Sequence, residues 1–228
     1  MLSAILQFLA DPRNNLWGET LAFLRLCLVP IDIATATGII LGVLVSKNSV
    51  LAFIAINASD LIRAIPVLAA LFLFVPIFKV GFLPATIALT LLGIPPVLIN
   101  TYEGLHSIDS ATIEAARGMG MTNWQIITRV QVPLVLPVIA SGLRTSAVQI
   151  VATAPLGGLI GAGGYGNYII DGVNTLNTVE ILAGSLLVAG LAISLELLME
   201  WVERLLTPAG VRFRMQGEKQ TVSRTARL

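Results

Sequence analysis

The chain contains very few of the residues from which metal centres and nucleophilic active sites are built. Among 228 residues there is one cysteine, Cys27, and one histidine, His106. A single cysteine excludes an internal disulfide, and an isolated histidine cannot form a metal site with the usual Cys/His spacing. Cys27 lies within an apolar run, where burial as a small hydrophobe is its expected role. We therefore expect no metal and no cofactor.

Charged residues are also scarce. They make up 12% of the chain, against 56% hydrophobic residues, whereas soluble domains average about 25% charged residues. This composition is typical of an integral membrane protein. No Gly-Lys dipeptide occurs, which excludes the phosphate-binding P-loop of an ATPase, and no Ser/His/Asp constellation or catalytic carboxylate pair is present. We therefore expect a non-enzymatic chain with no catalytic residues; any ATP hydrolysis would belong to a separate chain.

Five apolar stretches are long enough to cross a membrane, since about 20 apolar residues span a hydrocarbon core of roughly 30 Å. They predict an all-α integral membrane protein with about five transmembrane helices, forming a domain of residues 1–206. An amphipathic piece over residues 1–15 is expected at the membrane surface. A sixth span arises only if the second stretch, which charges and a proline interrupt, is split. Gly38 and Gly42 form a small-xxx-small pair that lets another helix approach closely. The stretches are residues 26–45, 50–78, 80–102, 134–156 and 179–206.

Residues 107–133 form a polar island between the third and fourth stretches. A first short helix is expected to begin at Asp109 or Ser110, both good N-caps, and to end at the glycines at positions 118 and 120. A second is expected to begin at Thr122, because a glutamine three residues later has the spacing of a capping box. Pro133 is expected to end it. Helices this short are marginal alone, so a groove on another protein is one way to hold them; an ordinary loop with helical tendency is the alternative.

The distribution of lysine and arginine predicts the orientation in the membrane. With five spans and the polar island in the cytoplasm, only Arg13 and Lys79 lie on the outer side. The N-terminus is then external and the C-terminus cytoplasmic, with residues 207–228 as a basic cytoplasmic tail. The basic residues on the inner side are Lys47, Arg117, Arg129, Arg204, Arg212, Arg214, Lys219, Arg224 and Arg227.

Two further features fall within or beside the apolar stretches. Arg144 lies eleven residues beyond Pro133, or roughly 16 Å along a helix, near the middle of the membrane. It needs an acidic partner, for which Asp32 and Glu103 are the candidates, and an interhelical ion pair is favoured over direct substrate contact. The glycine-rich segment 157–166 satisfies GxGxxG through Gly161, Gly163, Gly164 and Gly166, but its flanks lack the βαβ unit of a dinucleotide site. A turn outside the membrane and a loop lining the transport path are its two interpretations.

The polar island carries a motif at fixed spacing. Glu114-Ala115-Ala116 is followed by Gly120 after three residues and by Val130-Gln131-Val132-Pro133 after nine more. This resembles the EAA loop, Glu-Ala-Ala, Gly and Ile-x-Leu-Pro, of the permease subunits of binding-protein-dependent ABC importers, with two valines as the only departures. In that family the loop couples the permease to the cytoplasmic ATPase by docking into its cleft. The resemblance implies this role for Glu114, Ala115, Ala116, Gly118, Gly120, Met121 and Thr122.

Other segments are similar to one subgroup, the permeases of osmoprotectant importers for glycine betaine, carnitine or choline. They are Thr101-Tyr102-Glu103-Gly104-Leu105, Gly142-Leu143-Arg144-Thr145 and Leu159-Ile160-Gly161-Ala162-Gly163-Gly164. Tyr165 departs from the Leu or Phe usual after these glycines. The resemblance implies a type I ABC importer permease fold, multi-pass in the bacterial inner (cytoplasmic) membrane. It also implies as partners cytoplasmic ATP-binding subunits, an extracytoplasmic substrate-binding protein and a second permease chain, identical or related. Contact with the lipid bilayer is expected, and contact with nucleic acid is not.

Three alternatives remain open from the residues. The same machine could carry another small solute such as methionine. An ion-driven secondary transporter would need inverted repeats and ion ligands at the membrane midplane, and no internal repeat is found. An assembly or scaffold protein would have no need of a coupling loop.

Overall fold

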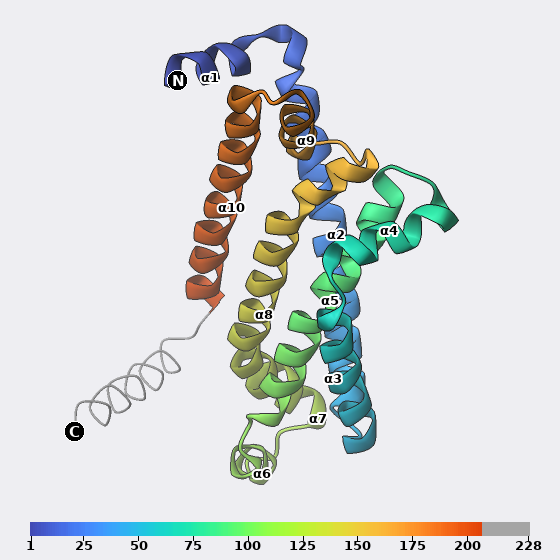
Figure 1. The fold of residues 1–228 in the computed structure, drawn as a ribbon. Helices are drawn as coiled ribbons and strands as arrows, with labels where there is room; N and C mark the ends of the chain where they lie inside the picture. Colours follow the sequence, from blue (N-terminus) through green and yellow to red (C-terminus); the bar gives the residue numbers. More distant parts are fainter. Residues whose placement is uncertain (207–228) are drawn as a thin grey trace, which may run out of the picture.

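A computed structural model describes residues 1–206, and this part is helical almost throughout (Figure 1). The predicted basic tail, residues 207–228, lies outside the described residues. The elements in chain order are α1 (Leu2–Ala10), η1 (Pro12–Asn14), α2 (Leu16–Val45), α3 (Ser49–Ala64), α4 (Val67–Phe78), α5 (Phe82–His106), α6 (Ser110–Gly118), α7 (Asn123–Ile126), η2 (Ile127–Gln131), α8 (Val132–Thr153), η3 (Ala154–Ile160), α9 (Tyr165–Thr175) and α10 (Thr178–Leu206).

Four helices of the described part are long and apolar enough to cross a membrane, and a bent pair supplies a fifth candidate. The pair is α3 and α4, whose axes differ by 92°. The break follows from Pro66, because the residue before a proline avoids helical backbone, and Ile65 is extended. The second predicted stretch is therefore a bent helix pair with the geometry of a broken span or a re-entrant loop, and counting it as one span gives five crossings.

Helices α2, α5 and α8 form the centre of the bundle, where buried side chains such as Phe23, Leu89 and Ile150 make up the core and glycines allow the closest approach of α2 to α5. A Cβ at Gly38 or Gly42 of α2 would overlap Val97 or Thr101 of α5, so this pair of glycines allows the close contact, as predicted. On the other side of α5, Ser146 of α8 donates a hydrogen bond of 2.8 Å to the carbonyl of Gly93. These contacts hold α5 between its two neighbours.

The prediction that Pro133 ends the second short helix is wrong. The helix that begins at α7 continues through the π-helical segment η2 into α8, and the whole run from Asn123 to Ile160 is one candidate span. Within η2 the backbone N–H of Val132 donates to the carbonyl of Ile127, five residues back. Pro133 lacks an N–H and enters in the first turn of α8, where the wider π turn accommodates it.

The polar island and the N-terminus lie at opposite ends of the bundle (Figure 1). Helix α1 crosses one end, where α9 and the start of α10 also lie, and α6 and α7 form the other end. Helices α2, α5 and α10 all run from the first end towards the second. The arrangement agrees with the predicted odd number of crossings when the bent pair of α3 and α4 counts as one.

Candidate functional site

The loop formed by residues 107–133 has a well-defined backbone. The side chain of Asp109 caps α6 by accepting from the N–H of Ala111 at 3.0 Å. At the other end, the N–H of Gly120 donates to Arg117 at 2.9 Å and that of Met121 donates to Ala116 at 3.2 Å. These two bonds form a Schellman motif, which needs a left-handed residue, and Gly120 has φ +80°. Both predicted ends of the first short helix are confirmed.

The second short helix begins with the predicted capping box. The N–H of Thr122 donates to Gln125 Oε1 at 2.9 Å, and the N–H of Gln125 donates to Thr122 Oγ1 at 3.3 Å. The Schellman motif ends at Met121 and the capping box begins at the next residue, Thr122. The two short helices are joined at a fixed angle, and α7 leads without interruption into α8.

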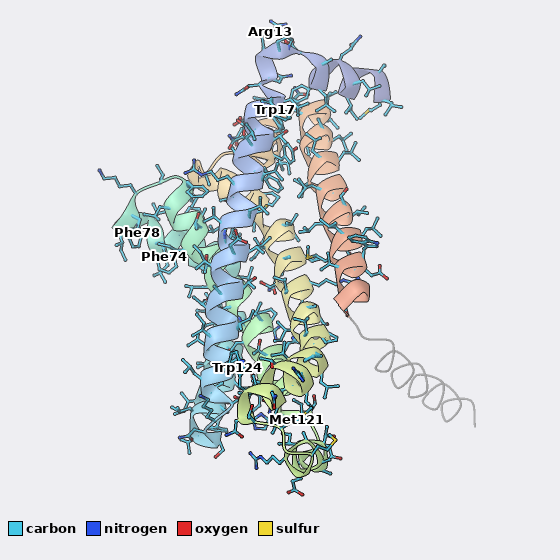
Figure 2. The ribbon with its side chains drawn as sticks, turned by 180° about the vertical axis from the view of Figure 1, so that it is seen from behind. Arg13, Trp17, Phe74, Phe78, Met121 and Trp124 are labelled. Atoms are coloured by element: carbon cyan, nitrogen blue, oxygen red, sulfur yellow. The ribbon has the colours of Figure 1, made fainter. Side chains whose placement is uncertain are left out.

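The two most exposed large apolar side chains of the loop, Met119 and Trp124, were not singled out from the sequence. Met119 and Trp124 are 73% and 72% exposed, while Ala116 and Ile126 are buried in the loop at 2% and 3%. Figure 2 shows Trp124 and Met121 at the end of the molecule opposite Trp17 and Arg13. A methionine and a tryptophan within an otherwise polar segment were the available signal. Exposed apolar side chains rimmed by polar residues are typical of a protein-binding surface.

The predicted site residues do not form one site. Those from Glu114 to Thr122 lie together in the loop, whereas Gly161, Gly163 and Gly164 lie near the start of α9, towards the other end. Arg144 lies within α8 and Asp32 within α2, where Asp32 is on the exposed face. The structure thus separates a loop at one end from an ion pair in the bundle and a glycine segment at the other end.

Arg144 is paired with two carboxylates of α10. Its Nη2 lies 2.9 Å from Glu196 Oε1 and its Nη1 lies 3.4 Å from Glu203 Oε2. Neither Asp32 nor Glu103, the two partners considered from the sequence, takes part in these pairs. The helical spacing of the glutamates in the last span was the sequence signal for these partners of Arg144. Choosing them over Asp32 and Glu103 requires knowing that α10 packs beside α8.

We predict that the pair between Arg144 and Glu196 couples α8 to α10. In a double-mutant cycle of Arg144→Gln and Glu196→Gln, the coupling free energy of unfolding in detergent should be about 1 kcal/mol, the usual size for polar contacts between membrane helices. The Arg13–Asp11 pair is a matched control, because Arg13 is 89% exposed and its pair should show no measurable coupling. An unchanged melting temperature with reduced uptake would instead place Arg144 in the transport path.

The glycine segment is held against the first turns of α2. Glu19 Oε2 accepts from the N–H of Gly164 at 2.6 Å, and Glu19 Oε1 accepts from Asn167 Nδ2 at 3.2 Å. Tyr165 stacks on Phe23, with ring centroids 4.8 Å apart. Gly161, Gly163 and Gly164 all have positive φ, which explains the glycines without any nucleotide.

Tyr168 ties the same segment to the N-terminal end. Its hydroxyl donates to the carbonyl of Asn14 at 2.6 Å, and its ring meets Phe8 edge-on. Burial, with a smaller contribution from the charge of Glu19, raises the pKa of Tyr168 to about 12. The hydroxyl therefore stays protonated and remains a donor at physiological pH.

Neither a metal-ligand cluster nor a dinucleotide-binding unit is found among the described residues. Within residues 1–206 no group of three His, Cys, Asp or Glu side chains is placed to hold a metal. The GxGxxG segment follows a 3₁₀ turn rather than a strand, so the Rossmann interpretation has no structural support. What the geometry provides is a rigid, partly apolar loop continuous with a central helix of the bundle.

Comparison with known proteins places this geometry in a family. Residues 34–209 match the binding-protein-dependent transport system inner membrane component family. The chain is 36% identical over 216 residues to the carnitine transport permease protein OpuCB of Listeria monocytogenes, covering 95% of this chain and 99% of that protein. It is 34% identical over 212 residues to the osmoprotectant import permease protein OsmW of Salmonella typhimurium, covering 91% and 99%.

The fold is also similar to solved structures. An inward-facing MetNI methionine ABC transporter chain aligns with a TM-score of 0.73 at 23% identity, over 85% of this chain and 96% of that chain. This likeness concerns the fold alone, and it confirms the predicted type I permease architecture. Together with the family match, it establishes what the helical bundle and its protruding loop are: the chain belongs to the inner membrane components of binding-protein-dependent transport systems, as an ABC importer permease subunit.

Proposed function

We propose that this permease imports quaternary-ammonium osmoprotectants such as glycine betaine, carnitine or choline. The observation that carries the proposal is similarity over nearly the whole chain to permeases named for these solutes. One of them is the glycine betaine/carnitine/choline permease protein OpuCB of Bacillus subtilis, 32% identical over 96% of this chain and 99% of that protein. Transport is driven by ATP hydrolysed on separate cytoplasmic subunits.

The loop of residues 107–133 is the proposed docking element for those subunits. Its coupling residues are Glu114, Ala115, Ala116, Gly118, Gly120, Met121 and Thr122, and the exposed side chains of Met119 and Trp124 supply apolar contact. Because α7 continues through η2 into α8, a displacement of the docked loop is transmitted to a helix at the centre of the bundle. The π turn is a place where that helix can adjust, since such turns are frequent at functional sites.

The remaining partners and positions follow from the family. A second permease chain, identical or related, completes the path across the bacterial inner membrane, and a binding protein delivers solute at the outer end. Residues 1–206 form the membrane domain and residues 207–228 a cytoplasmic tail. Arg144 serves the bundle through its ion pairs, Asp32 faces away from the bundle centre, and Gly161, Gly163 and Gly164 shape the outer end.

Recognition of the solute is assigned to the binding protein. A quaternary ammonium group is commonly held by a cage of aromatic faces, and this chain has 6% aromatic residues with three tryptophans. Trp17 and Trp124 lie towards opposite ends of the molecule (Figure 2). The tryptophans are therefore not gathered around a site in the middle of the bundle.

Uptake of labelled solutes tests the proposed substrate class. Cells lacking this chain should lose uptake of at least one of glycine betaine, carnitine and choline, most clearly at high osmolarity, and should regain it on complementation. Methionine uptake is the control and should not change. Loss of methionine uptake alone would contradict the osmoprotectant assignment while leaving the permease assignment intact.

We predict that the N-terminal end of the bundle is extracytoplasmic and the loop cytoplasmic. A cysteine replacing the exposed Arg13 should react with a membrane-impermeant thiol reagent in intact cells. A cysteine replacing the exposed Met119 should react only after permeabilisation. The natural Cys27 is 2% exposed and provides a low background. The reverse labelling pattern would contradict the orientation.

A further inference from the structure

A cavity of about 670 Å³ lies between α2, α5 and the start of α8, close to the loop. Its volume is within the range of about 300–1,000 Å³ that ligand sites occupy. Residues from all three helices and from the π-helical segment line it, so it is a feature of the assembled bundle. Val43 and Val132, both in its wall, are exposed, which shows that the cavity opens to the side of the molecule.

The lining divides into an apolar part and a basic part. The apolar part includes Ile39 and Val43 of α2 and Val135 and Ile139 of α8. The basic part consists of Lys47, just beyond the end of α2, and His106, the last residue of α5, and the uncharged polar residues Ser46, Thr101 and Gln131 also line the cavity. No acidic residue is among those that line this cavity. The lining is thus complementary to an amphiphile that has an anionic head group and an apolar chain.

The dimensions match one leaflet of a bilayer. From Ile39 to Lys47 the α2 helix and the following turn advance about 12 Å, at 1.5 Å per helical residue. Half of a hydrocarbon core of roughly 30 Å is about 15 Å. The basic end of the cavity therefore lies near headgroup depth when its apolar end lies in the hydrocarbon, where the side opening meets acyl chains.

We propose that this cavity binds one anionic phospholipid of the inner leaflet. Its phosphate lies between Lys47 and His106, and one acyl chain enters between α2 and α8. The assignment to the inner leaflet rests on the proposed orientation, but binding itself does not depend on transport. Because the π-helical segment supplies Ile127 and Gln131 to the wall, the bound lipid touches the connection between the docking loop and α8.

Photo-crosslinking in vesicles tests the site. The full chain, purified with its co-purifying subunits, is reconstituted with phosphatidylglycerol that carries a diazirine on its acyl chain, and labelled peptides are identified by mass spectrometry. Labelling should fall on residues 39–43 and 135–139. It should be several-fold weaker with a matched phosphatidylcholine probe, since each basic residue near an anionic headgroup contributes about a fivefold preference.

Variants distinguish the cavity from general contact with lipid. Lys47→Glu should reduce phosphatidylglycerol labelling about fivefold or more, while Lys47→Arg should retain it. Lys79→Glu is the matched control, because Lys79 does not line the cavity and its substitution should leave labelling unchanged. Ile139→Trp, which fills the apolar part, should reduce labelling by both probes.

Three outcomes would overturn the proposal. Equal labelling by the two phospholipids, unaffected by Lys47→Glu, would mean ordinary contact with the bilayer. Equal competition by a free fatty acid would show that the phosphate headgroup is not recognised. Absence of lipid labelling, with a cysteine at Val43 crosslinking to another protein chain, would show that a subunit covers the cavity. None of these results bears on which solute is transported.

Discussion

Replacing Gly120 by leucine should lower ATP-driven uptake about tenfold or more while leaving the chain in the membrane. Gly120 has φ +80° at the left-handed position of the Schellman motif. A residue with a Cβ costs roughly 1–2 kcal/mol there, which corresponds to about a tenfold loss of the native turn. Nothing lies within 4 Å of the added Cβ, so the loss comes from the backbone conformation and from bulk on the docking face. Uptake, membrane abundance and co-purification of the ATPase should be measured together.

Two variants in the same loop serve as controls for Gly120→Leu. Gly118→Ala adds a Cβ to a neighbouring coupling residue at a helical position with ordinary φ and nothing within 4 Å, so it should lower uptake far less than Gly120→Leu. Gly120→Asn should retain more activity than leucine, because asparagine tolerates left-handed backbone. Full uptake by Gly120→Leu would remove the shape of this turn from the coupling mechanism.

The second large effect is expected at the opposite end, from Gly164→Ala. Gly164 has φ +85°, and an added Cβ would lie 2.9 Å from Cα of Phe23. The strained backbone costs about 1–3 kcal/mol, and the clash adds to this because main chain of α2 must move. The hydrogen bond from Gly164 to Glu19 would be displaced as well. The variant should show a melting temperature lowered by several degrees and reduced abundance in the membrane.

Two other glycines separate strain from overlap. Gly161→Ala also has a positive φ, +69°, but in the left-handed helical region, which is less strained than the Gly164 backbone at ψ −171°, and its Cβ meets nothing within 4 Å; it should therefore carry only a smaller strain. Gly190→Ala in α10 has neither problem and should be neutral or slightly stabilising. The expected order of melting temperatures is Gly190→Ala, then Gly161→Ala, then Gly164→Ala as the lowest. Equal values for the last two would show that the contact with Phe23 is unimportant.

Local chemistry explains why parts of the loop were predictable. Asp109, Thr122 and Gln125 satisfy backbone groups within three residues of themselves, so their spacing in the sequence is enough to place both helix starts. Gly120 likewise marks a turn that depends on its own φ. The prediction for Pro133 is wrong because the effect of a proline depends on the backbone of the preceding turn. The π turn before Pro133 lets the helix continue past a residue that has no backbone N–H, and no residue pattern in the sequence predicts that turn.

Hydropathy and short-range patterns were enough to predict the membrane class, the approximate number and position of the spans, the two caps of the loop and the EAA-type motif. Each of these depends on hydropathy or on interactions between residues close in the chain. The packing of the helices was needed to show that Arg144 pairs with Glu196 and Glu203, that Glu19 holds the glycine segment, and that Lys47 and His106 border one cavity. The residues in these contacts come from helices far apart in sequence. Several acidic residues were available to pair with Arg144, and the packing of α8 against α10 selects Glu196 and Glu203. The packing of α2 beside α5 likewise brings Lys47 and His106 to the same cavity.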